Sequence, residues 1–115
     1  MASIDLNQLV AEIKAAATGV LKKDVTTFQG FSEKQLKGIA QQAAFVATGI
    51  ATKQITEETE QFFLDSLEDM ALSFAKTLRG LLTVTIEKVW NAIVGVLWNA
   101  ISKAANVALP VPVLG

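Results

Sequence analysis

The sequence predicts an all-α protein, and three observations lead to this fold class. Apolar residues recur at steps of three and four along most of the chain, which is the spacing of one face of an α-helix. Helix-start patterns precede these runs. The 115 residues include only two prolines, and both lie in the last six positions. We therefore expect a single helical domain over residues 1–115.

The first helix is predicted over residues 5–23. Asp5 can cap its N-terminus, with Gln8 at the third helical position, and an apolar face follows at helical spacing. The segment 24–31 mixes β-branched and turn-forming residues and approaches its end at Gly30, which predicts a linker.

The second helix is predicted over residues 32–54. Ser32 and Gln35 form a capping-box pattern, and Phe31 with Leu36 supplies a hydrophobic staple across it. Small residues then recur along one face of this helix, and they favour close packing against another helix.

One long helix is predicted over residues 56–106, beginning at Thr56. A continuous helix of this length would extend about 75 Å. Gly80 and the β-branched run 83–86 are the places where a kink or a short turn is the alternative. Its apolar residues are predicted to contact copies of the chain or another partner; they are Phe63, Leu67, Met70, Phe74, Leu78, Leu82, Ile86, Val89, Trp90, Ile93, Val96, Leu97, Trp98 and Ile101.

A neutral polar stripe runs along the last part of this long helix, between two apolar flanks. Its residues are Lys88, Asn91, Gly95, Asn99, Ser102 and Asn106. The tetrad Trp-Asn-Ala-Ile occurs at residues 90–93 and 98–101, and an eight-residue step rotates by about 80° beyond two turns. We therefore expect two successive contact sites, with the stripe facing a lumen or axis; the solvent side of a surface helix is the alternative.

The last segment, 107–115, is predicted to be extended, because its two prolines exclude helix. Such an apolar segment is expected to dock on another surface. The docking residues are Leu109, Pro110, Val111, Pro112, Val113 and Leu114.

Composition argues against an enzyme. The chain has no His, Cys or Tyr, and no glycine-rich phosphate loop, so the usual acid–base pairs and thiol nucleophiles are missing. We expect no catalytic residue, no metal and no cofactor. A net charge of −1 gives no basic field for nucleic acid, and nothing suggests a small-molecule substrate.

Charge is nevertheless unevenly distributed. Residues 1–55 hold six Lys and four acids, 56–75 hold six acids and no base, and 76–115 hold four bases and one acid. These runs of +2, −6 and +3 could pair between subunits or form a solvated face. No signal peptide is visible, so we expect synthesis in the cytoplasm, with an assembled particle or a membrane as possible final sites.

The function expected from these features is a non-enzymatic, self-associating helical protein in a virion-like or channel-like assembly. Hydrophobic residues form 51% and charged residues 18% of the chain, an apolar excess for its size. In composition and layout the chain is similar to minor structural proteins of phage particles. The alternatives are a membrane-associated amphipathic protein and a helical binding module that docks on another protein. The expected partners are accordingly further copies, other structural proteins or a lipid surface.

Overall fold

The computed structural model describes residues 3–115, and these form helices and no strand. The all-α fold class is confirmed. The elements are α1 (Leu6–Leu21), a short 3-10 helix η1 (Val25–Thr27), α2 (Glu33–Ala51), α3 (Glu57–Thr77) and α4 (Thr83–Ala105).

Three helices begin where their capping residues predict. The Asp5 carboxylate accepts a hydrogen bond from the Gln8 amide at 3.1 Å, and the Ser32 hydroxyl accepts one from the Gln35 amide at 3.1 Å. Thr56 precedes α3 and forms a reciprocal capping box with Thr59. Each cap satisfies amide groups that the first helical turn leaves without a partner inside the helix.

The long helix predicted over 56–106 is divided, and this corrects the expectation of a continuous helix. Leu78 leaves helical geometry at ψ 123°, and Gly80 has φ +83°. Helix resumes at Thr83, so the β-branched run 83–86 forms the first turn of α4. The turn folds α4 back, which gives four helices of ordinary length instead of one extended helix.

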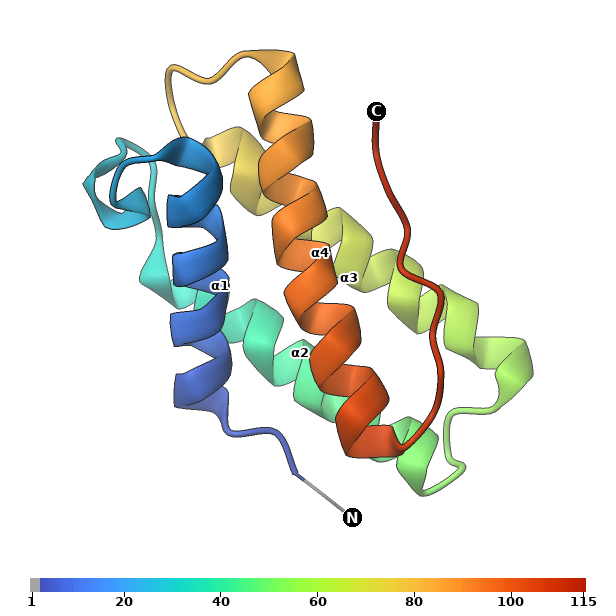
Figure 1. Ribbon diagram of the computed structural model, residues 1–115. Helices are drawn as coiled ribbons and strands as arrows, with labels where there is room; N and C mark the ends of the chain where they lie inside the picture. Colours follow the sequence, from blue (N-terminus) through green and yellow to red (C-terminus); the bar gives the residue numbers. More distant parts are fainter. Residues whose placement is uncertain (1–2) are drawn as a thin grey trace.

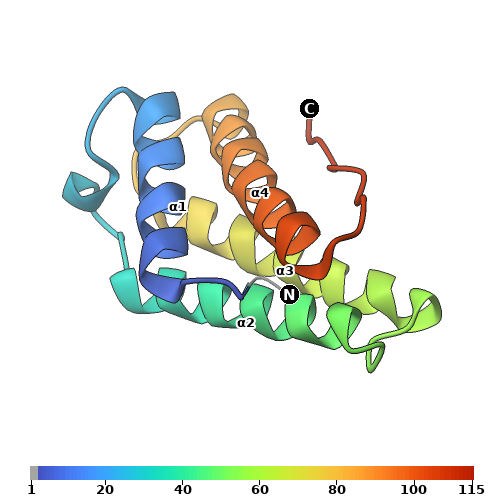
Figure 2. The same cartoon turned by 60° about the horizontal axis from the view of Figure 1, so that its bottom comes forward.

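The helices form two layers (Figure 1). α1 and α4 lie side by side, and α2 and α3 form a hairpin that crosses behind them; Figure 2 shows α2 beneath both. α4 contacts each of the other three helices, and α2 also contacts α1 and α3. The described chain measures 41 × 28 × 18 Å.

Small side chains allow α2 to approach its neighbours. Ala40 and Ala43 are fully buried and Ala47 nearly so. Around them packs a core to which every α-helix contributes, and its largest fully buried members are Trp98, Phe74, Ile13, Leu36, Ile39, Leu67, Ile93, Leu97 and Ile101. No polar or charged residue is buried among the described residues.

The C-terminal tail, residues 107–115, is extended and follows Asn106, which caps α4 in the left-handed conformation. The tail reverses direction and runs back beside α4 (Figure 1). Leu109 and Leu114 are half-buried and pack against the core, while Val111 and Val113 are exposed.

Candidate functional site

The apolar residues predicted to contact other copies lie mostly inside this chain. Nine of them are buried: Leu67, Phe74, Leu78, Val89, Trp90, Ile93, Leu97, Trp98 and Ile101. Phe63, Met70, Ile86 and Val96 are half-buried against the same core, and Leu82 alone is largely exposed. The buried and half-buried members therefore pack inside the chain as core residues. Contact with other copies stays a prediction, and of this set only the exposed Leu82 and the half-buried edge residue Phe63 are taken up in the surface patches described below.

Both tryptophans of the repeated tetrad belong to this core. Trp90 is 3% exposed and Trp98 is 2% exposed. The Trp90 indole Nε1–H donates a hydrogen bond of 2.9 Å to the Glu68 backbone carbonyl, which ties α4 to α3. The tetrads therefore make contacts within the chain, where contacts to two neighbouring copies were predicted.

None of the residues of the predicted polar stripe is buried, so the stripe lies on the side of α4 away from the core. Its members have different surroundings there. Asn91 lies beneath the C-terminal tail, and Asn99 lines a groove beside α1. Gly95 and Ser102 are half-buried, Lys88 is exposed, and Asn106 caps α4. The position of the stripe agrees with the alternative of an outward-facing side of α4, and a lumen or axis stays a prediction.

Asn91 holds the C-terminal tail through the tail backbone. Its amide Nδ2 donates to the Leu114 carbonyl at 3.0 Å, and the Leu114 N–H donates to Asn91 Oδ1 at 2.8 Å. The side-chain amide thus pairs with both polar groups of one residue, as a neighbouring strand would. Both hydrogen bonds are to backbone atoms, so they do not depend on which side chain the residue at position 114 carries.

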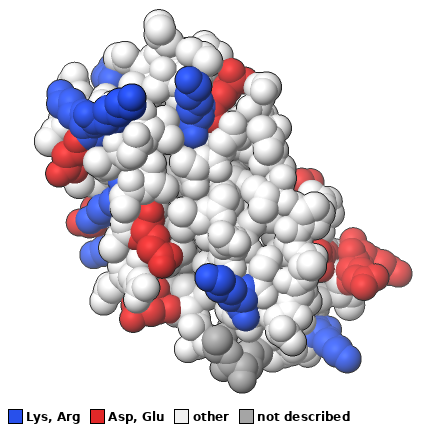
Figure 3. Space-filling view, viewed as in Figure 1, with Lys and Arg blue, Asp and Glu red and all other residues white. Residues whose placement is uncertain are grey.

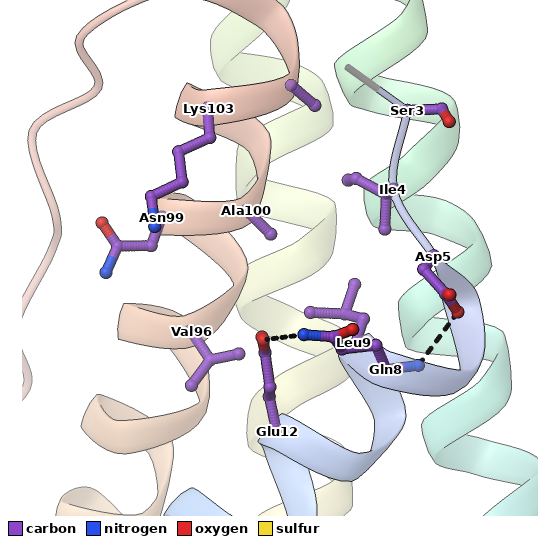
Figure 4. A pocket seen from close by; sticks show the side chains of 11 residues that line it. Ser3, Ile4, Asp5, Gln8, Leu9, Glu12, Val96, Asn99, Ala100 and Lys103 are labelled. Carbon is purple, nitrogen blue, oxygen red and sulfur yellow. Dashed lines mark hydrogen bonds between the residues drawn. The ribbon is translucent and has the colours of Figure 1, made fainter.

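The groove beside α1 has a volume of about 490 Å³ and is open to solvent. Its lining comes from the start of α1 and the last part of α4 (Figure 4) and comprises Ser3, Ile4, Asp5, Gln8, Leu9, Glu12, Val96, Asn99, Ala100, Lys103 and Ala104. Gln8 donates hydrogen bonds to two carboxylates. Its backbone N–H donates to Asp5, and its side-chain Nε2 donates to Glu12 at 3.4 Å. The carboxylates of Asp5 and Glu12 therefore already accept hydrogen bonds within the first turns of α1.

The acidic residues of α3 are spread along its surface. No group of three acidic side chains is placed to hold a metal ion anywhere in residues 3–115. Glu68 is half-buried, as is Glu60, and the partial burial of Glu68 raises the pKa of its carboxyl above the ordinary range. The neighbouring carboxylates of Asp65 and Asp69 raise that pKa further, because they repel a third negative charge.

Replacing Glu68 with glutamine is expected to stabilise the fold at pH 7 and not at pH 4. Because the pKa is raised in the folded state, the folded protein binds the proton more tightly, and stability falls as pH rises through that pKa. Glu68→Gln removes this penalty, a gain of about 0.5 kcal/mol at a partly exposed position. Urea denaturation at both pH values measures it.

The matched control is Glu57→Gln, in the exposed first turn of the same helix. There a negative charge interacts favourably with the helix dipole, so its removal is expected to give no gain at pH 7. An equal gain from both variants would assign the effect to the net charge of α3 and contradict the local repulsion at Glu68.

An aromatic patch on the outer surface includes one predicted contact residue, Phe63, and two residues that were not predicted. It consists of Phe45 on α2 and Phe62 and Phe63 on α3. Phe62 is 73% exposed and Phe45 is 58% exposed. Phe63 lies between them, with ring centroids 6.0 Å from Phe45 and 5.4 Å from Phe62. The sequence signal for this patch is that Phe45 and Phe62 lie outside the apolar faces of their helices.

A second exposed apolar pair lies where α4 begins. We call it the loop patch; it consists of Leu82 and Val84, which are 72% and 53% exposed. Arg79 precedes Leu82 in the same connection, and Lys88 follows Val84 by one helical turn; both are exposed.

None of the helices in residues 3–115 has the length and hydropathy needed to cross a bilayer. No family model matches the chain, and no curated protein or solved structure matches it either. What is inferred about function therefore comes from the surface residues.

Proposed function

We propose that this protein is a non-enzymatic helical building block that assembles with copies of itself, the aromatic patch of one copy packing on the loop patch of the next. The observation that carries this proposal is the pair of exposed apolar patches with rims of opposite charge. Because the apolar flanks of α4 lie in the core, the contact is assigned to these patches instead of the C-terminal helix.

The rim of the aromatic patch is acidic. Glu58 lies four residues before Phe62 and Asp65 three residues after it, so both carboxylates share its helix face. Both are exposed. In Figure 3 acidic side chains gather at the edge where α3 begins. A partner surface with positive charge around an apolar centre would complement this patch, whereas an anionic lipid surface would be repelled.

The loop patch supplies that complementary chemistry. Leu82 and Val84 provide the apolar centre, and Arg79 and Lys88 provide two positive charges near it, against one acid, the half-buried Glu87. Contacts between such surfaces gain affinity from apolar burial, and opposite charges add specificity and faster association. A second copy of the chain therefore fits the aromatic patch in both hydrophobicity and charge.

The two patches lie on elements that begin toward different ends of the molecule, α3 at the lower right and α4 at the top (Figure 1). A contact between two different surfaces is heterologous, and repetition of such a contact produces a ring when it closes and a filament when it does not. Either product suits a structural or tube-like role.

A charge-exchange experiment tests the contact. In Glu58→Lys/Asp65→Lys both rims are basic, and in Arg79→Glu/Lys88→Glu both rims are acidic. We expect the wild type to assemble in size-exclusion chromatography with light scattering, and each double variant alone to be monomeric. An equimolar mixture should assemble again, because every contact then joins a basic rim to an acidic rim.

Two further variants separate apolar burial from charge. Phe62→Ser should abolish assembly, whereas Val113→Ser, at a side chain that is equally 73% exposed but outside both patches, should leave it unchanged. A wild type that stays monomeric at all concentrations would refute the proposal. If it instead floats with neutral liposomes, the alternative of a membrane-associated protein replaces it, and rescue only by a different protein would indicate a binding module.

A further inference from the structure

The C-terminal tail occupies a surface of its own, distinct from the two patches. We call this surface the tail seat and define it by Glu87 and Asn91 of α4. The two hydrogen bonds between Asn91 and Leu114 hold the end of the tail. Leu109, Pro112 and Leu114 are half-buried along its length, so they anchor the tail on the helices.

None of these contacts requires the tail to come from the same chain. Asn91 recognises the N–H and C=O of an extended segment, and the leucines contribute apolar burial. Pro110 and Pro112 fix the backbone near extended geometry and remove two N–H donors, so a free tail loses less conformational entropy on binding. A tail from another copy would make the same bonds with the same side chains.

The connection between α4 and the end of the tail is only just long enough to reach Asn91. From Asn106 back to Asn91 the helix covers about 22 Å. From Asn106 to Leu114 an extended chain at about 3.1 Å per residue covers about 25 Å. The tail therefore reaches Asn91 only in an almost fully extended form, and a short hinge of this kind favours exchange between chains.

The reversal itself also depends on an unfavourable backbone conformation. Asn106 has φ +55°, and the Val107 N–H donates to the Ser102 carbonyl at 3.1 Å. The left-handed conformation is disfavoured for residues other than glycine, although Asn tolerates it best. Opening the turn releases this conformation, while the contacts of the tail are kept if it enters another seat.

We propose that the tail seat accepts the tail of a second copy, so that copies become linked by exchange of residues 107–115. The exchanged form keeps every contact of the closed form and differs in the turn at Asn106 and in the entropy of association. It is therefore favoured by high local concentration. The tail seat does not include either patch, so exchange does not rest on the proposed function.

Cysteine cross-linking tests the exchange directly, because the chain contains no cysteine. A Cβ built on Gly115 would lie 3.5 Å from the Glu87 carboxyl group. One full-length chain carries Glu87→Cys and a second, distinguishable by mass, carries Gly115→Cys. They are mixed, unfolded together, refolded at high concentration and oxidised with diamide, which takes up the two protons and two electrons released as the disulfide forms.

We expect the mixed disulfide, which joins the tail of one chain to the seat of another, to be the main cross-linked product. The matched control pairs Gly115→Cys with Lys34→Cys, an exposed position on α2, and should give only the yield of random collisions. Adding Asn91→Ala to the Glu87→Cys chain should reduce the mixed disulfide to that control yield.

Asn106→Gly provides a graded test of the hinge. Glycine adopts the left-handed conformation freely, so this change stabilises the closed turn and should lower the mixed disulfide about fivefold. A mixed yield no higher than the Lys34→Cys control would overturn the proposal. So would failure of a Glu87→Cys/Gly115→Cys chain to close its own disulfide at high dilution, because the tail would then not occupy the seat.

Repeating the mixture in the Glu58→Lys/Asp65→Lys background separates the two proposals. Persistence of the mixed disulfide there shows exchange without the patch contact. A wild type that assembles but gives no mixed disulfide refutes exchange alone, and a monomeric wild type that still exchanges at high concentration refutes the patch contact alone.

Discussion

Trp98→Ala is expected to lower the free energy of unfolding by about 3–5 kcal/mol, the range for removing a large aromatic side chain from a core. Trp98 is 2% exposed and is the largest of the fully buried side chains. Its removal leaves a cavity in the core beside α4, the helix that contacts all three other α-helices. Urea denaturation followed by circular dichroism measures the loss without relying on tryptophan fluorescence.

The control is Trp90→Phe, in the other tetrad. It keeps most of the buried ring and removes the Nε1–H that donates to the Glu68 carbonyl, so the expected loss is about 1 kcal/mol. The protein concentration supplies the decisive comparison. A loss that persists on dilution assigns Trp98 to the core of one chain, whereas a loss that disappears on dilution would assign it to a contact between copies.

The beginnings of the helices could be predicted because their causes are local. Asp5, Ser32 and Thr56 each lie next to the amide groups that their side chains satisfy. A capping residue and its partner are three positions apart in the sequence, so no knowledge of the rest of the fold is needed.

The neighbours of α4 could not be predicted from its sequence. Two apolar flanks require packing on both sides, and the periodicity does not say whether the packing comes from the same chain or another. Here α1, α2 and α3 supply it. The periodicity therefore indicated that residues such as Ile93 and Leu97 need a packing partner, and in this structure the other helices of the same chain bury them.

The role of Asn91 was hidden for a related reason. Its partner is the backbone of Leu114, 23 residues away, and every residue of the chain offers similar backbone groups. The sequence indicated a polar residue among apolar ones and an apolar tail that needs a surface. Only the path of the chain after Asn106 brings the two together.

The break between α3 and α4 shows a further limit of periodicity. Phe74, Leu78, Leu82 and Ile86 continue the four-residue spacing through the break. Phe74 and Leu78 enter the core at the end of α3 and Ile86 packs against it from α4, whereas Leu82 is exposed in the turn between them. A turn that keeps the spacing is therefore invisible to periodicity. Gly80 indicated the right place, but the contacts that fix the turn come from the segment after α1.

Those contacts involve Gln29, Gly30 and Phe31. The Gln29 carbonyl accepts a hydrogen bond from the Arg79 N–H at 2.9 Å, and Phe31 packs edge-on against Phe74 with ring centroids 6.0 Å apart. Between them Gly30 has φ +95°, and a Cβ added there would overlap the Thr77 carbonyl group. The linker thus docks on the last turn of α3 where the helix ends.

Gly30→Ala is accordingly expected to lower the free energy of unfolding by about 3 kcal/mol. A positive φ costs alanine about 1–2 kcal/mol, and the overlap with Thr77 forces the linker away, losing the Gln29–Arg79 hydrogen bond at about 1 kcal/mol more. Gly80→Ala is the matched control, because Gly80 has φ +83° but no atom within 4 Å of the added Cβ. In Gly80→Ala the free energy of unfolding should fall by only about 1–2 kcal/mol, the cost of a positive φ for alanine. Urea denaturation of both variants separates the contributions, and equal losses would mean that the linker does not hold the end of α3.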